Sequence, residues 1–318
     1  MKVYITRKIP SIAKELLLKS NFDVKEYAKD KPISKLELIK NARNSDAVIS
    51  LLTDQFDKEV IDSIPKLKII SNYAVGFNNI DVHYAREKGI VVTNTPDILT
   101  DATADLASAL VLACARNLIQ SEKFMRERKF EGWKPKLFLG YELRNKIVGI
   151  IGAGRIGFET AKRLKSFGTD IIYYNRSRKE EFEKELNAKK VSLKKLMKSS
   201  DIISLHLPLN ESTNNLINKD YLELMKHSAI FINTARGEIV DESYLIKMLQ
   251  KGRIFAAGFD VYFGEPKVNT KIYNLKNAVI LPHLGSATFE ARNKMAELCA
   301  KNVINVLNNK KALTEVKV

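Results

Sequence analysis

At 318 residues, the chain is longer than one hydrophobic core usually serves, so two domains are expected. Hydrophobic residues make up 45% and charged residues 28%, which is typical of a globular protein and argues against a disordered or fibrous one. The formal net charge is +16, but Lys and Arg are scattered and often stand beside Glu, which favours a solvated basic surface over a nucleic-acid-binding patch.

The N-terminal segment MKVYIT runs directly into a predicted strand without the apolar stretch of a secretory signal, and no apolar run approaches membrane-spanning length. We therefore expect a cytoplasmic protein that binds neither membranes nor nucleic acid. Cys114 and Cys299 lie in apolar helical patterns, which predicts buried thiols and argues against a disulfide or a metal site.

Short apolar segments alternate with amphipathic helical patterns through the first hundred residues: KVYIT, SIAKELLLK, DAVISLL, FDKEVIDSI, LKIISNYA, VHYAREKG and GIVVTN. This alternation predicts β-α units and a parallel sheet. A helical pattern then runs from about Thr100 to Arg128, where we expect one long helix, and the loop FEGWKPKLFLGYEL follows it.

A second series of strands and helices begins at NKIVGIIGAG and continues through DIIYY, DIISLHLPL, AIFINTA, RIFAAGFDVY and NAVILPHLG. The closing helical pattern FEARNKMAELCAKNVINVL has no strand after it, so we expect it to pack on the first series. The sequence therefore predicts an α/β protein in which a domain spanning 99–287 is inserted into a first domain formed by 1–98 and 288–318.

A glycine pattern, G-x-G-x-x-G, stands directly after an apolar strand and opens an amphipathic helix in the inserted domain. In this context the first glycine permits a tight turn, the second lets backbone approach a pyrophosphate, and the third allows close packing of helix and strand. The pattern predicts a dinucleotide-binding domain whose pyrophosphate site is formed by Gly152, Ala153, Gly154, Arg155, Ile156 and Gly157.

The next strand ends in YYNRSRK, where NAD-binding domains usually carry an acidic residue that binds the ribose hydroxyls. Asn175 removes the charge that would repel a 2′-phosphate, and Arg176, Ser177 and Arg178 supply donors suited to bind one. We therefore expect a preference for NADP(H). Alternatively, the two arginines are solvated and Asn175 binds the ribose hydroxyls, which would allow NAD(H) as well.

Four histidines are candidates for a proton donor. His83 and His227 lie on or beside charged helical segments, where surface or capping roles suffice. His206 ends a strand before the turn that starts at Pro208, so contact with the cofactor or packing is expected for it. His283 follows the strand NAVILP and precedes a Gly-Ser turn that can project the ring into a cleft; a buried structural histidine is the alternative.

A histidine that donates a proton needs a carboxylate to orient the ring and favour its protonated form. Glu265, at the strand exit DVYFGEP, is the candidate, with a solvated loop acid as the alternative. Arg236 follows the strand AIFIN and could bind a substrate carboxylate and polarise a ketone through its planar fork, although an exposed loop arginine is also conceivable.

The blocks GAGRIG, INTARGEIVD, GFDVYFGEP and LPHLGSAT, in this order and spacing, resemble those of the D-isomer-specific 2-hydroxyacid dehydrogenase family, closest to glyoxylate/hydroxypyruvate reductases. The resemblance implies two Rossmann-like or flavodoxin-like domains and NAD(P)H-dependent reduction of a small 2-oxo acid such as glyoxylate or hydroxypyruvate. It further implies a homodimer built through the nucleotide domains, with Arg236, Glu265 and His283 as the catalytic set.

The same resemblance implies roles for residues outside the catalytic set. The loop NYAVGFNNIDV would bind substrate, with the amides of Val75 and Gly76 holding its carboxylate and Leu52 lining the pocket; Asn78 departs from the commoner Asp. Trp133 would lie near the substrate or pack at the dimer contact. Further cofactor contacts are implied for Thr103, Thr234, Ala235, Asp260 and Ser286 around the nicotinamide end, and for Pro208 and Thr213 beside the adenosine.

Two other functions are compatible with these blocks. A 3-phosphoglycerate dehydrogenase shares them but usually prefers NAD, against which the segment YYNRSRK argues. A dehydrogenase-like corepressor keeps the fold and even the catalytic residues while acting as a binding protein, and turnover would distinguish it.

Overall fold

The computed structural model describes residues 1–317 and forms two compact units. Unit 1 comprises Met1–Leu99 and Ser286–Val318, and unit 2 comprises Thr100–Gly285. The chain thus leaves the first unit once and returns to it once, at boundaries beside the expected 98/99 and 287/288.

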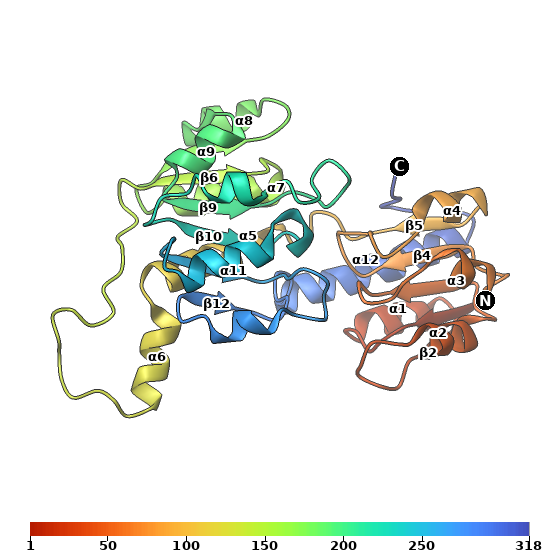
Figure 1. Ribbon diagram of the computed structural model, residues 1–318. Coiled ribbons are helices and arrows are strands. Elements are labelled where there is room, and N and C mark those ends of the chain that lie inside the picture. Colours follow the sequence, from red (N-terminus) through yellow and green to blue (C-terminus); the bar gives the residue numbers. More distant parts are fainter. Residues whose placement is uncertain (318) are drawn as a thin grey trace. The chain divides into compact units, whose positions relative to one another are not determined.

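Unit 1 contains a five-stranded sheet in which every neighbouring pair is parallel. The strand order β2-β1-β3-β4-β5 is the flavodoxin-like order of doubly wound folds (Figure 1). The strands are β1 (Lys2–Ile5), β2 (Asp23–Glu26), β3 (Ala47–Ser50), β4 (Ile69–Asn72) and β5 (Val91–Thr93).

Helices cover both faces of this sheet, as the buried side chains on both faces of β1, β3 and β4 require. One core contains side chains of α2, α3 and α4, and the other contains those of α1 and α12, including the buried Cys299. The final helix packs on the first series of strands, as expected. The helices are α1 (Ile12–Lys19), α2 (Lys35–Ala42), α3 (Lys58–Asp62), α4 (Val82–Glu87) and α12 (Phe289–Leu307).

Unit 2 contains a seven-stranded, wholly parallel sheet in the order β12-β11-β10-β9-β6-β7-β8. The order reverses at β6, which places a topological switch point at the carboxyl end of this strand, where open α/β sheets bind ligands. The strands are β6 (Ile147–Ile151), β7 (Asp170–Tyr174), β8 (Lys189–Lys190), β9 (Ile202–Leu205), β10 (Ile230–Asn233), β11 (Ala256–Phe259) and β12 (Ala278–Ile280).

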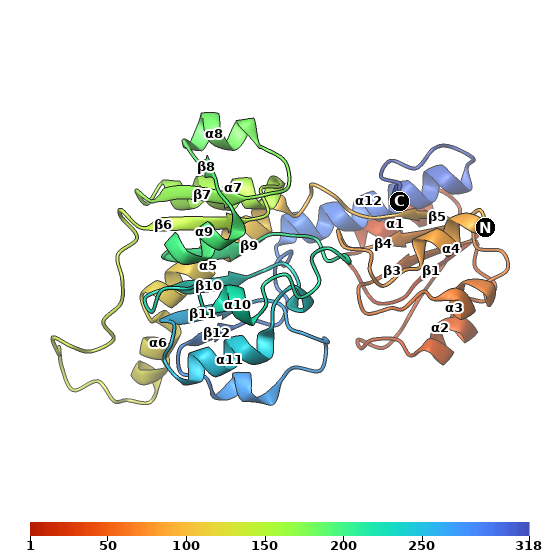
Figure 2. The same cartoon turned by 45° about the horizontal axis from the view of Figure 1, so that its top comes forward.

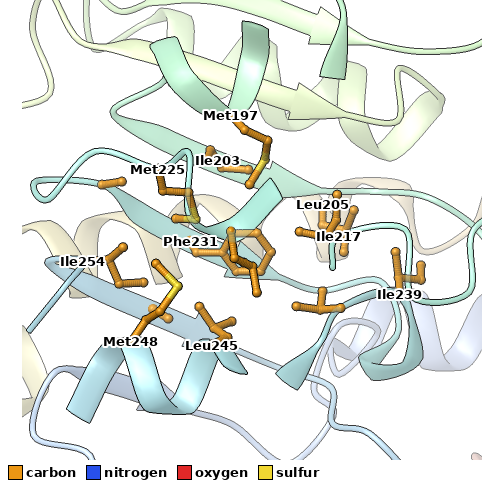
Figure 3. Close-up of a cluster of buried hydrophobic side chains, with 14 of the residues drawn as sticks. Met197, Ile203, Leu205, Ile217, Met225, Phe231, Ile239, Leu245, Met248 and Ile254 are labelled. Carbon is orange, nitrogen blue, oxygen red and sulfur yellow. The ribbon is translucent and has the colours of Figure 1, made fainter. Parts of the chain in front are cut away.

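Two hydrophobic cores lie on opposite faces of this sheet. One contains the buried Cys114 of α5 and side chains of α7 and α8, and the other contains side chains of α9, α10 and α11 (Figure 2). In the second core, Phe231 of β10 lies among the methionines Met197, Met225 and Met248 (Figure 3). The helices are α5 (Thr100–Ala115), α6 (Leu118–Arg126), α7 (Arg155–Lys165), α8 (Glu180–Leu186), α9 (Leu193–Ser199), α10 (Lys219–Leu222) and α11 (Glu242–Gln250), with 3-10 helices η1 (Gly237–Ile239) and η2 (Thr270–Asn274). The predicted α/β class with two parallel sheets is confirmed.

The expectation of one helix from about 100 to 128 is wrong. Asn117 adopts a left-handed backbone conformation with φ of 50°, and α5 and α6 meet there at a bend of 66°. The Asn117 side chain donates to the carbonyls of Phe138 and Leu139, which ties the break to the following loop. Within residues 1–317, no single helix is long and apolar enough to cross a membrane, although the bent pair α5–α6 passes on length and composition.

Candidate active site

The turn after β6 is built by three glycines with different surroundings. Gly152 has φ of 99°, and a side chain there would overlap the main-chain carbonyl of His206. A side chain at Gly157 would overlap the carbonyl of Gly152, so α7 lies directly against the strand exit. Gly154, by contrast, faces open space and begins α7 without a side-chain cap. The turn thus leaves exposed backbone at a helix N-terminus, which favours anions.

The end of β7 lies beside this turn, because Gly152 N–H donates to the Tyr174 carbonyl. The Asn175 amide donates to the carbonyl and hydroxyl oxygens of Ser177 at 3.1 and 3.3 Å. Arg178 is held by Glu183, with 2.7 Å between Nε and Oε2. The exposed Arg176 side chain has no hydrogen-bond or ion-pair partner among residues 1–317, and Lys190 donates to its main-chain carbonyl at 3.1 Å.

The end of β9 carries His206, which shares a 2.8 Å hydrogen bond with Ser204 through Nε2. Burial lowers the pKa of His206 to about 3, so the ring is neutral. In the turn that follows, the hydroxyl of the buried Thr213 donates to the Pro208 carbonyl at 2.7 Å and accepts from the Asn210 amide at 2.9 Å. Thr213 therefore fixes the shape of this turn.

The loops after β10 and β11 supply the residues expected near a nicotinamide ring. The Ala235 amide donates to the Asn233 side chain at 3.0 Å. The Thr234 hydroxyl is buried, and it has no hydrogen-bond partner in the described part of the chain. Thr103, near the start of α5, donates to the Gly285 carbonyl at 3.0 Å. An unpaired buried hydroxyl is costly and calls for a partner that a ligand can supply.

Asp260 holds the turn that carries His283. Its carboxylate oxygens accept from the amides of Leu284 at 2.6 Å and Gly285 at 2.8 Å, and its side chain is fully buried. Burial raises the pKa of Asp260, although these amides and the charge of His283 oppose the rise. His283 itself adopts a left-handed backbone with φ of 58°. The sequence indicated a contact of Asp260 with the cofactor, but did not reveal this hold on the turn.

His283 and Glu265 form a direct pair, with 2.8 Å between Nδ1 and Oε2, and about a third of each side chain is exposed. The other Glu265 oxygen accepts from the Tyr262 amide at 2.8 Å. Burial would raise the pKa of Glu265, but the hydrogen bond and charge of His283, the Tyr262 amide and the charge of Arg236 lower it below its usual value. Glu265 is therefore an ionised carboxylate. On the His283 ring it bonds only to Nδ1 and makes no contact with Nε2.

Arg236 stands at the end of the same set of strands. Its Nη1 donates to the Ala235 carbonyl at 2.6 Å, and burial lowers its pKa, against the charges of Glu265 and Glu238. The structure therefore brings Arg236, Glu265 and His283 into one electrostatic cluster in unit 2. It also adds Glu242, whose buried carboxylate accepts from the Phe263 amide at 2.9 Å. Sequence reasoning missed Glu242, because an acid at a helix start is usually an exposed capping residue.

In unit 1, the loops after β3 and β4 carry Leu52, Val75 and Gly76, all partly exposed. Asn94 donates to the Val75 carbonyl and Asn72 to the Gly76 carbonyl, both at 2.8 Å. The amides of Val75 and Gly76 have no partner among residues 1–317. Two adjacent free amides with tethered carbonyls form a site suited to a small anion.

Buried asparagines support these loops. Asn79 donates to the carbonyls of Leu51 and Asp54 at 3.1 and 2.9 Å, and Asn72 donates to the Asn79 side chain at 3.2 Å. Ser286, also in unit 1, accepts from Arg292 through its main-chain carbonyl at 3.1 Å.

Trp133 lies in the loop after α6 and is 84% exposed. Together with Leu118 of α6 and with Phe130 and Phe138, it lines a hollow of about 590 Å³. Figure 1 shows α6 and this loop extending away from the sheet of the same unit. No residue of α6 is buried.

Unit 2 therefore has the features that a dinucleotide requires. The open space at Gly154 leaves room for a pyrophosphate. The segment Asn175–Arg178 lies beside the same turn, at the position expected for a ribose. The buried Thr234 hydroxyl is available for a hydrogen bond to a ligand. The residues present fit the cofactor predicted from the glycine pattern.

Comparisons with known proteins agree with this geometry. The family model described as "D-isomer specific 2-hydroxyacid dehydrogenase, NAD binding domain" matches residues 108–285. The chain is 48% identical over 307 residues to the glyoxylate reductase of Pyrococcus horikoshii and 49% identical over 307 residues to that of Thermococcus litoralis. Each match covers 95% of this chain and 92% of the relative.

Solved structures are similar over the same extent. A protein from Thermus thermophilus matches with a TM-score of 0.94 and 39% identity, covering 100% of both chains. An NADPH-dependent glyoxylate/hydroxypyruvate reductase from Sinorhizobium meliloti, in complex with NADP and malonate, matches with a TM-score of 0.88 and 32% identity, covering 99% of this chain and 96% of that one.

Proposed function

The chain belongs to the D-isomer-specific 2-hydroxyacid dehydrogenase family, as its sequence blocks indicated, and we propose that within this family it is a reductase of glyoxylate or hydroxypyruvate that prefers NADPH. Membership makes it an oxidoreductase that uses a nicotinamide cofactor to reduce a 2-oxo acid. The observation that carries the proposal is the His283–Glu265 pair beside Arg236.

His283 is the proton donor in this proposal. When bound, a nicotinamide cofactor would supply the hydride for the ketone carbon, and the ketone oxygen would then require a proton. Because Nδ1 of His283 bonds to Glu265, the ring presents Nε2 to the ketone oxygen and gives it the proton that completes the hydroxyl group. Glu265 orients the ring and stabilises its protonated form before transfer.

Arg236 binds the substrate carboxylate and polarises the ketone. Burial lowers its pKa but also reduces solvent screening, so the guanidinium attracts a bound anion more strongly than a solvated arginine would, and it can bind a carboxylate and a ketone oxygen through separate N–H groups. The amides of Val75 and Gly76 in unit 1, which have no partner among residues 1–317, are candidate donors to the substrate carboxylate, with Leu52 and Trp133 as further candidate substrate contacts.

Preference for NADPH rests on the residues after β7. Arg176 is exposed, Ser177 carries a hydroxyl, and Lys190 approaches through the Arg176 carbonyl, so positive charge gathers where a 2′-phosphate would bind. Arg178 contributes less than the sequence suggests, because Glu183 already pairs with it.

The exposed apolar side chains of α6 and the loop after it support a homodimer formed through the nucleotide domain. Contiguous apolar surface of this kind is typical of protein interfaces. Analytical ultracentrifugation checks this: Ile119→Glu, on α6, should yield monomer, whereas Phe167→Glu, at an exposed apolar site after α7, should leave the dimer intact. Equal effects of both substitutions would contradict an interface through α6, and a monomeric wild type would contradict the dimer itself.

Initial rates with glyoxylate and hydroxypyruvate, each against NADPH and NADH, test the proposed reaction. NADPH-dependent turnover that falls about 100- to 10,000-fold in His283→Ala is the expected result, given what a positioned general acid contributes. A clear NADH preference would refute the cofactor assignment. Absence of turnover with both acids would refute the substrate assignment and favour 3-phosphoglycerate or a binding function.

A further inference from the structure

The loop between β11 and Glu265 is held by an unusual set of hydrogen bonds. Three successive main-chain amides each donate to a different carboxylate. Tyr262 donates to Glu265 at 2.8 Å, Phe263 to Glu242 at 2.9 Å, and Gly264 to Glu238 at 3.3 Å. The first carboxylate belongs to the loop itself, and the other two come from η1 and α11. The position of the loop therefore depends on acids that lie outside it.

Glu242 is the most enclosed of the three acids. It is 6% exposed and is the first residue of α11. Burial raises its pKa, the charges of Glu238 and Glu265 raise it further, and the Phe263 amide lowers it. A buried carboxylate beside two other acids lowers the stability of the fold unless hydrogen bonds compensate for the burial. Its presence here indicates a need for a hydrogen-bond acceptor that an apolar side chain would not supply.

The segment that carries Glu242 also carries Arg236, and it lies directly against the loop. A side chain at Gly237 would overlap the main chain of Tyr262 and Phe263, so only glycine permits this approach. The loop is tied on its other side by Tyr262, whose hydroxyl donates to the Leu281 carbonyl at 2.8 Å, two residues before His283. The segment 236–242 and the loop therefore form one support beneath the proposed catalytic groups.

We propose that Glu242, assisted by Glu238, is a positioning residue that holds the Phe263 amide and thereby keeps Glu265 in place on His283. This inference rests on the proposed roles of Glu265 and His283. Glu242 itself contacts the loop and not the His283 ring. The charged groups around the Glu265–His283 pair are Arg236, Glu238, Glu242 and Asp260.

The first test observes His283 without substrate or cofactor. Imidazole signals are followed by NMR against pH in the wild type and in Glu242→Ala and Glu242→Gln, with His283→Ala identifying the signals. Loosening Glu265 withdraws its stabilisation of the protonated ring, so the titration midpoint of Glu242→Ala should fall by about 0.5 pH unit or more. Glu242→Gln keeps an oxygen for the Phe263 amide and should remain close to the wild type.

Asp241→Ala is the matched control. Asp241 caps the same helix by accepting from the Tyr244 amide at 2.9 Å, so its loss weakens α11 without removing a hydrogen bond from the loop. It should leave the midpoint unchanged. Glu238→Ala, which removes the longer bond to Gly264, should shift the midpoint in the same direction as Glu242→Ala but by less.

The second test is a double-mutant cycle in kcat. Glu242→Ala should lower kcat about 10-fold, consistent with loss of a hydrogen bond to a charged group, with KM changed less than about 2-fold. In a Glu265→Ala background the same substitution should change kcat less than about 2-fold, since the residue through which it acts is gone.

An undiminished effect in the Glu265→Ala background, or a midpoint displaced no further by Glu242→Ala than by Asp241→Ala, would overturn the positioning role. If Glu242→Ala does not fold, Glu238→Ala decides in the same two assays. A wild type that turns over neither glyoxylate nor hydroxypyruvate would refute the proposed function, while the NMR titration would still decide the role of Glu242.

Discussion

His206 makes the stability of unit 2 sensitive to mild acid, and His206→Gln should remove much of that sensitivity. The pKa of His206 is lowered from 6.5 to about 3 by burial. Between these two pH values the His206 ring is protonated in the unfolded chain but neutral in the native one, so the free energy of unfolding falls as pH drops below about 6.5. Above that pH both states are neutral and the penalty vanishes.

The size of the effect follows from the shift. At pH 5, about 1.5 units below the pKa of the unfolded histidine, protonation stabilises the unfolded state by about 2 kcal/mol, at roughly 1.4 kcal/mol per unit. Part of the residue remains open to solvent, so we expect between about 1 and 2 kcal/mol. For a unit of this size, each kcal/mol corresponds to about 2–4 °C in Tm.

Tm is measured for the apo wild type and His206→Gln at pH 7.5 and pH 5, by circular dichroism. Gln can keep a hydrogen bond to Ser204 and does not titrate, while the other acid-sensitive groups are common to both proteins. The fall in Tm between the two pH values should be several degrees larger in the wild type. An equal fall in both proteins would refute the assignment of a neutral, buried ring.

Other substitutions test the site more directly. Glu265→Gln should move the pH optimum of reduction to lower pH, because an amide stabilises the protonated His283 ring less than the ionised carboxylate does; an unchanged pH profile would contradict the pairing. Gly154→Ala should keep its Tm within about 2 °C, since the added methyl meets open space, yet weaken NADPH binding measured by calorimetry; Gly157→Ala should lower Tm as well, because its methyl overlaps the Gly152 carbonyl. Arg176→Ala should raise KM for NADPH at least about 10-fold and leave KM for NADH within about 2-fold; equal changes would indicate that Arg176 does not contact the 2′-phosphate.

Local patterns revealed much of this protein in its sequence. The alternation of apolar and amphipathic segments predicted two parallel sheets, because each β-α unit repeats the same burial requirements. The glycine turn was equally legible, since Gly152 and Gly157 stand where a side chain would strike the main chain.

Features that depend on contacts between residues far apart in the sequence could not be predicted. The apolar period of the helix continues across Asn117, and the break is accompanied by hydrogen bonds to residues about twenty positions onward, among them Phe138 and Leu139. Glu242 looks like an ordinary acid at a helix start, and its burial arises because Gly237 allows a loop from β11 to cover it. In both cases the deciding contacts come from residues brought close by folding, and the sequence around Asn117 or Glu242 contains no pattern that predicts them.

The left-handed conformation of His283 has an evolutionary consequence. A residue with a Cβ atom in this conformation is less stable than glycine by about 1 kcal/mol. Glycine at position 283 would relieve this backbone strain but would remove both the hydrogen bond to Glu265 and the proposed proton donor. The backbone of this turn therefore favours glycine, and a lineage that keeps histidine here accepts the strain in return for the Glu265 pair and the proposed proton transfer.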